Sequence, residues 1–234
     1  MDLKTLAHLI SHDLKAPLNG IYSLVEFLEE DYADRLDDDG REQLRLIRQL
    51  SARGIAKVEA LGAYSRAATA PCVMRPLDLT GIATRVAATA AGRVAPCQTD
   101  VTIAGALPRV AGDPSLVPLL LDRLFANAFT FNTQPARHLW FGPLGDTTHD
   151  VPAGHVALAV RDNGIGIPER WHGGIFDLFK RLHGPDKFGG GAGVGLTVAR
   201  LIVRRHGGEI WVDRSSEAGT TLAFTLPAAL EEAH

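Results

Sequence analysis

Two long apolar repeats in the first 70 residues most constrain how this chain can fold. In the first repeat, apolar residues recur at alternating steps of four and three positions, and similar spacing returns after an interruption in the second. This spacing gathers the residues along one stripe of a helix and is typical of helices that pack side by side. The first repeat comprises Leu3, Ala7, Ile10, Leu14, Pro17, Ile21, Leu24 and Leu28, and the second comprises Leu44, Ile47, Ser51, Gly54, Val58, Leu61 and Ser65.

The two repeats predict a helical hairpin over residues 1–70. Between them, the run Asp37-Asp38-Asp39-Gly40 interrupts the pattern and predicts a turn. One hairpin cannot bury both apolar stripes, so a dimeric four-helix bundle is the favoured completion. An isolated monomeric hairpin is the alternative.

Residues 71–234 have a different, mixed pattern. The segment from Ala70 to Pro76 lacks periodicity and predicts a short linker. Beyond it, helices and strands alternate without the regular spacing of a doubly wound fold, which favours a layered α/β sandwich with a mixed sheet. The clearest expected elements are helices from Asp113 to Thr130 and from Gly195 to His206, and strands at Val156–Val160, Glu209–Asp213 and Thr221–Leu226.

Charge and composition exclude several classes of protein. The formal net charge of −3 over 234 residues provides no basic field for nucleic acid. Cys72 and Cys97 form neither a disulfide framework nor a recognisable metal motif, and we expect free thiols. No apolar run reaches the roughly 20 residues of a membrane helix, so we expect a cytoplasmic chain without a membrane segment.

A histidine with nucleophilic potential lies in the first predicted helix. His12 follows Ile10 by two positions, so it is expected to face solvent rather than the partner helix. A neutral imidazole can attack phosphorus through one ring nitrogen, and the adjacent Asp13 can hold the proton of the other nitrogen. Taken alone, an ordinary exposed histidine beside an aspartate explains the pattern as well.

A polar stripe runs along the predicted helix that follows Asp113. Arg123, Asn127 and Thr130 recur at the spacing of one helix face, apart from the apolar residues of the same segment. The amide oxygen of Asn127 suits Mg²⁺, a hard cation that prefers oxygen ligands. Taken alone, a solvated helix face is the simpler interpretation.

Two glycine-rich segments follow further along the chain. Asp162-Asn163-Gly164-Ile165-Gly166 comes after a predicted strand, where the backbone can approach a flat ring and the carboxylate can accept a hydrogen bond from an adenine amino group. The run from Gly189 to Leu196 opens a predicted helix, and free N–H groups at a helix start favour phosphate. Its glycines also suit a mobile lid. Neither segment has the context of a dinucleotide fingerprint.

In order and spacing, these motifs resemble the sequence boxes of histidine kinases. The closest spelling is that of phytochrome-type kinases. The corresponding segments are Ser11–Leu18 for the phosphoacceptor box, Leu119–Asn132 for the Asn box, Asp162–Pro168 for the first glycine box, Ile175–Arg181 for the Phe box, Gly191–Leu196 for the second glycine box, and a turn at Thr220-Thr221.

The resemblance implies a fold and an activity. Residues 1–70 would form the dimerisation and phosphotransfer hairpin, and residues 71–234 an ATP-binding domain of the type shared with gyrase, Hsp90 and MutL. With ATP and Mg²⁺, such a core phosphorylates its own histidine and passes the phosphate to an aspartate of a response regulator. A sensor, on a separate chain or outside this sequence, is implied as well.

The resemblance also implies individual roles. His12 would be the nucleophile, Asp13 its base or orienting partner, and Lys180 or Arg181 a cation that neutralises phosphate charge. Asn127 would hold Mg²⁺ and Asp162 would read adenine. The residues implied at the nucleotide are Arg123, Asn127, Thr130, Asp162, Gly164, Gly166, Gly191, Gly193, Gly195, Leu196 and Thr220.

Two departures from the family pattern leave alternatives open. Arg123 stands where the Asn box usually begins with Asn, and Thr130 stands where it usually carries Lys. A degenerate kinase that acts as a nucleotide-binding dimeric scaffold is therefore one alternative. A histidine phosphotransfer relay is another, although a relay has no need of both glycine boxes. A gyrase-type ATPase does not explain the segment around His12.

Overall fold

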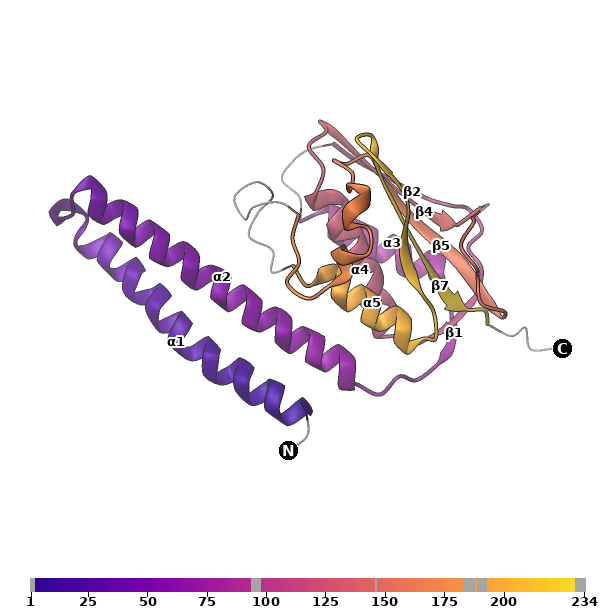
Figure 1. The fold of residues 1–234 in the computed structure, drawn as a ribbon, viewed down its shortest axis with the longest axis horizontal. Coiled ribbons are helices and arrows are strands. Elements are labelled where there is room, and N and C mark those ends of the chain that lie inside the picture. Colours follow the sequence, from indigo (N-terminus) through magenta and orange to yellow (C-terminus); the bar gives the residue numbers. More distant parts are fainter. Residues whose placement is uncertain (1–2, 94–97, 146, 183–187, 189–192, 230–234) are drawn as a thin grey trace.

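The protein consists of a long helical hairpin and an α/β unit, which a computed structural model shows joined end to side (Figure 1). The hairpin extends away from the α/β unit, and the C-terminal part of its second helix contacts that unit. The structure describes residues 3–93, 98–145, 147–182, 188 and 193–229, and within the first helix it describes side chains only from Asp13 onward.

The hairpin is formed by α1 (Leu3–Asp31) and α2 (Asp38–Thr69), joined by a short 3₁₀ turn at Ala33–Arg35. The predicted turn at Asp37–Gly40 is wrong. Asp37 is instead the cap of α2, and its side chain accepts a hydrogen bond of 2.8 Å from the Gly40 backbone N–H. Acidic residues in a first turn complement the positive end of the helix dipole, which explains why a run of aspartates begins a helix here.

The two faces of α1 have different surroundings. Leu18 and Val25 face α2, and the contact is so close that a Cβ on Gly54 would lie 2.9 Å from the Leu18 side chain. The predicted apolar stripe of α1 is instead exposed from Leu14 onward, with Leu24 64% accessible. No described helix combines the length and apolarity needed to cross a bilayer. An exposed stripe of this kind supports the predicted dimer.

The α/β unit contains a five-stranded sheet in the order β2-β4-β5-β7-β6 and a separate two-stranded sheet of β1 and β3. β2 pairs parallel with β4 and the other neighbours pair antiparallel, so the predicted mixed sheet is confirmed. The elements are β1 (Arg75–Leu77), α3 (Leu79–Ala91), β2 (Gln98–Ile103), β3 (Val110–Gly112), α4 (Leu116–Thr130), β4 (Ala136–Pro143), β5 (His155–Asp162), 3₁₀ turns at Glu169–Trp171 and Gly174–Phe176, α5 (Gly195–Arg205), β6 (Ile210–Ser216) and β7 (Gly219–Pro227).

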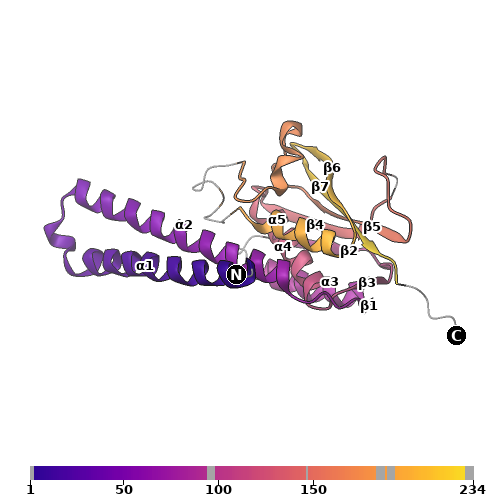
Figure 2. The ribbon, with the colours of Figure 1, turned by 60° about the horizontal axis from the view of Figure 1, so that its bottom comes forward.

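The main core lies between the large sheet and the three helices α3, α4 and α5, which cover one of its faces (Figures 1 and 2). In this layer Phe141 packs edge-on against Phe125 and stacks on Phe224, with ring centroids 5.6 Å and 6.4 Å away. The predicted apolar face of α4 is confirmed, because every member is buried: Val117, Leu120, Leu121, Leu124 and Ala128.

Helix α4 begins at Leu116, three residues after the predicted start. The capping part of the prediction is confirmed, since the Asp113 carboxylate accepts hydrogen bonds from the backbone N–H groups of Ser115 and Leu116. Asp113 is buried, but hydrogen bonds from the Ser115 hydroxyl and from backbone N–H groups outweigh that burial and lower its pKa to about 2. The helix start is therefore held by an ionised carboxylate.

The remaining expected elements agree in type, with shifted ends. α5 ends at Arg205, and the three predicted strands correspond to longer strands β5, β6 and β7. Sequence reasoning did not place α3 or the strands β2 and β4. These three elements make up one edge of the sheet and its covering helix.

The exposed stripe of α1 generates a prediction about assembly. We expect Leu24→Glu to shift the full chain from dimer toward monomer, because a carboxylate would have to be desolvated at the apolar contact between copies. Sedimentation equilibrium measures this. Ser23→Glu adds the same charge at the neighbouring exposed position and should leave the dimer intact. A wild-type chain that sediments as a monomer would contradict the expectation.

Candidate functional site

A cavity of about 830 Å³ lies between the hairpin and the α/β unit. Its walls come from α2, α4, the loop after β5, the Phe box and the start of α5. Most of the predicted site residues line it, namely Arg123, Asn127, Thr130, Asp162, Gly166, Lys180, Arg181, Gly193, Gly195, Leu196 and Thr220.

Two of the predicted residues that the structure describes do not line the cavity, and two others are not fully described. Gly164 lies in the loop beside it, and Asp13 is exposed on α1. Gly191 lies outside the described residues. His12 belongs to the backbone of α1, but its side chain is not among those described.

Helix α4 contributes the polar stripe that the sequence predicted. Burial of its apolar face directs Arg123, Asn127 and Thr130 into the cavity. Within the described part of the chain, the Asn127 side chain has no hydrogen-bond partner, so its amide oxygen is available to a ligand. Arg123 is only loosely paired, with its guanidinium 4.0 Å from Asp122.

Asp162 ends β5 and is the acidic group on the α/β side of the cavity, where Glu59 of α2 also lines the wall. Its Oδ1 accepts hydrogen bonds from the backbone N–H groups of Gly164 (2.8 Å) and Thr220 (3.2 Å). Burial raises the pKa of Asp162 to about 6, although these two hydrogen bonds act in the opposite direction. No described residue donates to its Oδ2, which leaves one carboxylate oxygen for a ligand donor.

Glycine is required in the first glycine loop by packing within the protein, which the sequence did not predict. A Cβ on Gly164 would lie 2.4 Å from the Phe131 carbonyl oxygen, at the end of α4. Gly166 has a φ of +71°, and a Cβ there would lie 1.9 Å from the Ser216 carbonyl oxygen on β6. The close approach is thus between backbone segments of the protein. It fixes the loop that carries Asp162 against both α4 and β6.

The second glycine segment contacts the Phe box. Gly193 has a φ of +70°, and a Cβ there would lie 2.9 Å from Arg181 Cγ and 3.0 Å from the Lys180 carbonyl oxygen. Gly195 is the first residue of α5, and its Cβ position meets no described atom within 4 Å. Packing therefore explains the glycine at position 193, whereas position 195 borders open cavity.

Positive charge gathers on the wall formed by the Phe box. Lys180 and Arg181 line the cavity, and the Lys180 ammonium lies 4.5 Å from the centroid of the Trp171 ring. This cation–π contact holds the ammonium near the cavity. Together with Arg123 on the α4 wall, these cations suit a polyanionic ligand.

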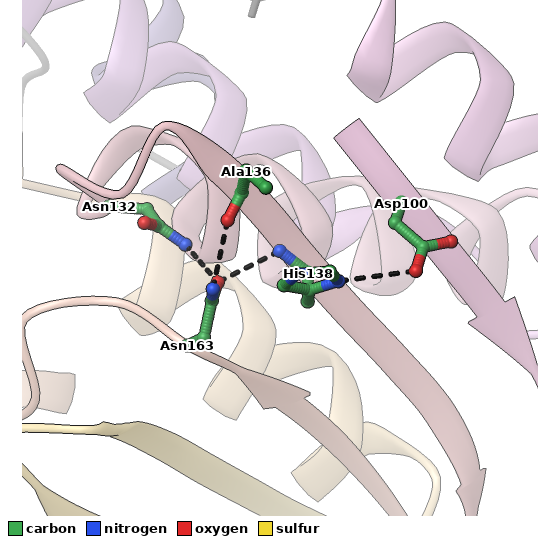
Figure 3. Close-up of polar contacts among 5 residues, drawn as sticks. All are labelled: Asp100, Asn132, Ala136, His138 and Asn163. Carbon is green, nitrogen blue, oxygen red and sulfur yellow. Dashed lines mark hydrogen bonds and ion pairs between the residues drawn. The ribbon is translucent and has the colours of Figure 1, made fainter. Parts of the chain in front are cut away.

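Asn163 was quoted in the glycine motif but given no role, and the structure shows one (Figure 3). Its Oδ1 accepts hydrogen bonds from Asn132 Nδ2 (2.7 Å) and from the His138 backbone N–H (2.8 Å), and its Nδ2 donates to the Ala136 carbonyl oxygen (2.9 Å). The amide thus ties the Asp162 loop to Asn132, just after α4, and to the start of β4. Its position between Asp162 and Gly164 in the motif is the sequence feature that could have indicated a role for Asn163.

Sequence reasoning also missed the wall formed by α2. Ala56, Ala60 and Ala63 line the cavity, and beside them Lys15 of α1 forms an ion pair of 2.6 Å with Glu59. The spacing of the three alanines, four and then three positions, marks a helix face with small side chains. That pattern was present in the sequence, but only the packing of the two units shows what it faces.

Burial of Asp162 generates a prediction about pH. Because the pKa rises from 3.8 to about 6, the folded protein binds this proton more tightly than the unfolded chain, and stability is lost as pH rises through about 6. Asp162→Asn keeps an acceptor for Gly164 and Thr220 without the desolvated charge. Its stability relative to wild type should rise between about pH 5 and about pH 8, by on the order of 1 kcal/mol.

Thermal unfolding of both proteins without nucleotide measures this difference. The same variant should bind ATP more weakly at the higher pH, because an amide is a poorer acceptor than a carboxylate. A relative stability that falls as pH rises would contradict the account of Asp162.

The Asn163 contacts generate a second prediction. Asn163→Ala leaves the Asn132 side chain and the His138 N–H without their acceptor, so we expect a loss of about 2 to 4 kcal/mol of stability and weaker ATP binding. Asn163→Asp keeps the acceptor and should be intermediate. Asp100→Asn changes the exposed partner of His138 and is the control. Denaturant unfolding and ATP titration measure the effects, and equal results for Asn163→Ala and the control would refute them.

Two family profiles match the chain, on its two structural units. The "His Kinase A (phospho-acceptor) domain" matches residues 2–69, which include the hairpin. The family "Histidine kinase-, DNA gyrase B-, and HSP90-like ATPase" matches residues 112–230, about half of the chain. The second range contains α4, the Asp162 loop and α5, and so most of the cavity wall.

Individual proteins resemble the chain over nearly its whole length. Cyanobacterial phytochrome B of Nostoc sp. is 37% identical over 225 residues, which cover 96% of this chain and 29% of that protein. Phytochrome-like protein Cph1 of Synechocystis sp. is 28% identical over 232 residues, which cover 97% of this chain and 29% of that protein. The chain therefore spans less than a third of the length of these two relatives.

The fold is shared with solved structures as well. The crystal structure of full-length ShkA in complex with AMPPNP matches with a TM-score of 0.66 at 21% identity, covering 98% of this chain and 47% of that chain. With a phospho-acceptor hairpin followed by an ATPase domain of this fold, the chain belongs to the family of histidine kinase-, DNA gyrase B- and HSP90-like ATPases, as the catalytic core of a sensor histidine kinase.

Proposed function

We propose that the chain is an ATP-dependent autokinase of a two-component system, which phosphorylates His12 and passes the phosphate to a response-regulator aspartate. The observation that carries the proposal is the shared cavity, whose walls combine the nucleotide residues of the α/β unit with residues of the hairpin. Lys15 of α1 lines the cavity on its hairpin side. Position 12 precedes Lys15 by three residues, which is about one turn of the same helix. Residues 1–70 then act as the phosphotransfer hairpin and residues 71–234 as the ATP-binding domain.

Different residues of the cavity suit the two ends of ATP. Asp162 accepts the adenine amino group through Oδ2, and the Thr220 backbone N–H is held beside it by its hydrogen bond to Oδ1. Arg123, Lys180 and Arg181 neutralise phosphate charge. Gly166, Gly193, Gly195 and Leu196 shape the cavity wall, Gly164 supports the loop that carries Asp162, and Gly191 has its role by resemblance.

Asn127 fits the role of Mg²⁺ ligand. Its amide oxygen is a hard donor on the cavity wall, with no competing partner in the described part of the chain. The described residues contain no group of three or more His, Cys, Asp or Glu side chains able to hold a metal. Asn127 would hold the ion together with phosphate oxygens of the nucleotide, and the ion would supply positive charge near the transferred phosphoryl group. Thr130 adds a hydroxyl at the same wall.

The chemical step moves one phosphoryl group. The lone pair of one His12 ring nitrogen forms a bond to the γ-phosphorus, while the bond from that phosphorus to the β,γ-bridging oxygen breaks and ADP leaves. Asp13 accepts a hydrogen bond from the other ring nitrogen, which holds the tautomer that attacks and stabilises the positive charge that develops on the ring. A carboxylate of the response regulator then takes the phosphoryl group from the histidine.

The alternatives differ in what the cavity has to do. A phosphotransfer relay needs no nucleotide pocket, yet this chain keeps the acidic group, the cations and the α4 amide in one cavity. A degenerate scaffold binds nucleotide without transfer. Arg123 and Thr130 motivate that alternative, but both side chains line the cavity and can contact phosphate.

Incubation with γ-labelled ATP and Mg²⁺ tests the proposed function. We expect acid-labile, alkali-stable label on the wild-type chain and none on His12→Gln or Asn127→Ala. His8→Gln is the matched control, because it removes a histidine one turn earlier in α1 and should leave labelling intact. Label on His12→Gln would refute the assigned nucleophile. ATP binding without labelling of the wild type would favour the scaffold, and absence of ATP binding would favour the relay.

A further inference from the structure

The end of α2 is held by a side chain from the end of α5. Arg205 is the last residue of α5, and its guanidinium donates from Nη1 to the Ala67 carbonyl oxygen and from Nη2 to the Ala70 carbonyl oxygen. Ala67 lies in the last turn of α2, and Ala70 is the residue that ends it. Figure 1 shows these two helix ends approaching each other, and α2 packs against α5.

This contact satisfies a general requirement of helix ends. The last four carbonyl groups of a helix lack partners within the helix, and they form the negative end of its dipole. A guanidinium is a planar cation with several donors in a fixed arrangement, so it can bind two such carbonyls at once. An ammonium offers no comparable fork.

The linker that follows α2 is held at the same place. The Val73 backbone N–H donates to Asp113 Oδ2 (2.8 Å), and the Asp113 backbone N–H donates to His206 Nε2 (3.0 Å). Asp113 also caps α4, and His206 follows Arg205 directly. The end of α2, the linker, the start of α4 and the end of α5 thus meet in one junction.

The junction includes the end of α2, and α2 forms the hairpin side of the cavity. Ala56, Glu59 and Ala63 line the cavity on the same helix whose end Arg205 holds. Arg205 itself does not appear among the lining residues. Its contacts therefore bear on the angle of α2 against the α/β unit, while the proposed adenine and phosphate contacts belong to α4, β5, β7, the Phe box and the glycine segments.

We propose that Arg205 is a positioning residue for phosphoryl transfer: it fixes the orientation of the hairpin relative to the nucleotide. The inference rests on the proposed autokinase function and deepens it. We call the two hydrogen bonds from Arg205 to the end of α2 the Arg205 clamp. Its loss lets α2 change its angle, and the helix that carries His12 moves with α2 through the α1–α2 contacts. Transfer should slow while nucleotide binding is unaffected, since misplacement of a reacting group by about 1 Å can cost up to about a hundredfold in rate.

The chain provides a matched control in the neighbouring residue. Arg204 has the same charge and lies in the same last turn of α5, but it is exposed, whereas Arg205 is partly buried. Replacing each by alanine removes one positive charge from the same place. A difference between the two variants then reports the contacts with α2 rather than the charge.

The experiment compares wild type, Arg205→Ala, Arg205→Lys and Arg204→Ala as full chains. Three quantities are measured: the affinity for ATP, the initial rate of self-phosphorylation at saturating ATP, and hydrogen exchange of the amides in residues 66–74. For Arg205→Ala we expect affinity within about twofold of wild type, a rate lower by about tenfold or more, and faster exchange. Arg205→Lys should be intermediate, and Arg204→Ala should match wild type.

Three results would overturn the inference. One is equal behaviour of the two alanine variants, which would reduce the effect to charge. A second is a loss of ATP affinity by Arg205→Ala as large as its loss of rate, which would indicate general damage. The third is a wild-type chain that binds ATP but is never labelled. That result contradicts the proposed function itself and removes the positioning role with it, whatever the exchange data show.

Discussion

Burial of the apolar face of α4 between α3, α5 and the large sheet fixes the direction of its polar face. Leu120, Leu121 and Leu124 are fully buried, and each such side chain contributes roughly 1.5 to 3 kcal/mol relative to exposure. A rotation of the helix by one residue would expose several of them. Arg123 and Asn127 therefore face the cavity because the rest of the helix leaves them no other direction.

The same helix connects the cavity to the rest of the protein at both of its ends. Its start is capped by Asp113, which also binds the linker and His206. Its end approaches the Asp162 loop, where the Ile165 backbone N–H donates to the Phe131 carbonyl oxygen at 3.1 Å. Asn163 adds hydrogen bonds to the segment that follows. The spacing between Asn127 and Asp162 is thus set by backbone contacts rather than by flexible side chains.

Sequence patterns predicted the parts of this arrangement that depend on periodicity. The apolar face of α4 and the hairpin follow from repeats of three and four residues, and the start of α5 at Gly195 follows from the glycine-rich run before it; the structure confirms all three. The turn prediction at Asp37–Gly40 was wrong because aspartates favour both turns and helix starts, and local sequence does not separate the two.

The remaining features depend on contacts between segments far apart in the chain. The Arg205 hydrogen bonds join residues more than a hundred positions apart, and the alanine face of α2 lines a cavity whose other walls come from distant segments. No periodic pattern reveals either feature. The first glycine loop shows the same limit: its glycines were assigned to approach of a ligand ring, whereas the structure shows them packed against carbonyl groups of Phe131 and Ser216. These packing contacts could not be predicted from the sequence, because they join the loop to segments far from it in the chain.

One cavity, built by both units, is proposed to hold ATP beside the helix pair that carries His12. Hydrogen exchange of the full chain with and without a non-hydrolysable ATP analogue tests this arrangement. We expect slower exchange with the analogue in two places, the loop around Asp162 and the α2 segment of residues 56–66. Protection confined to the α/β unit, with α2 unchanged, would contradict the claim that the hairpin forms part of the nucleotide site.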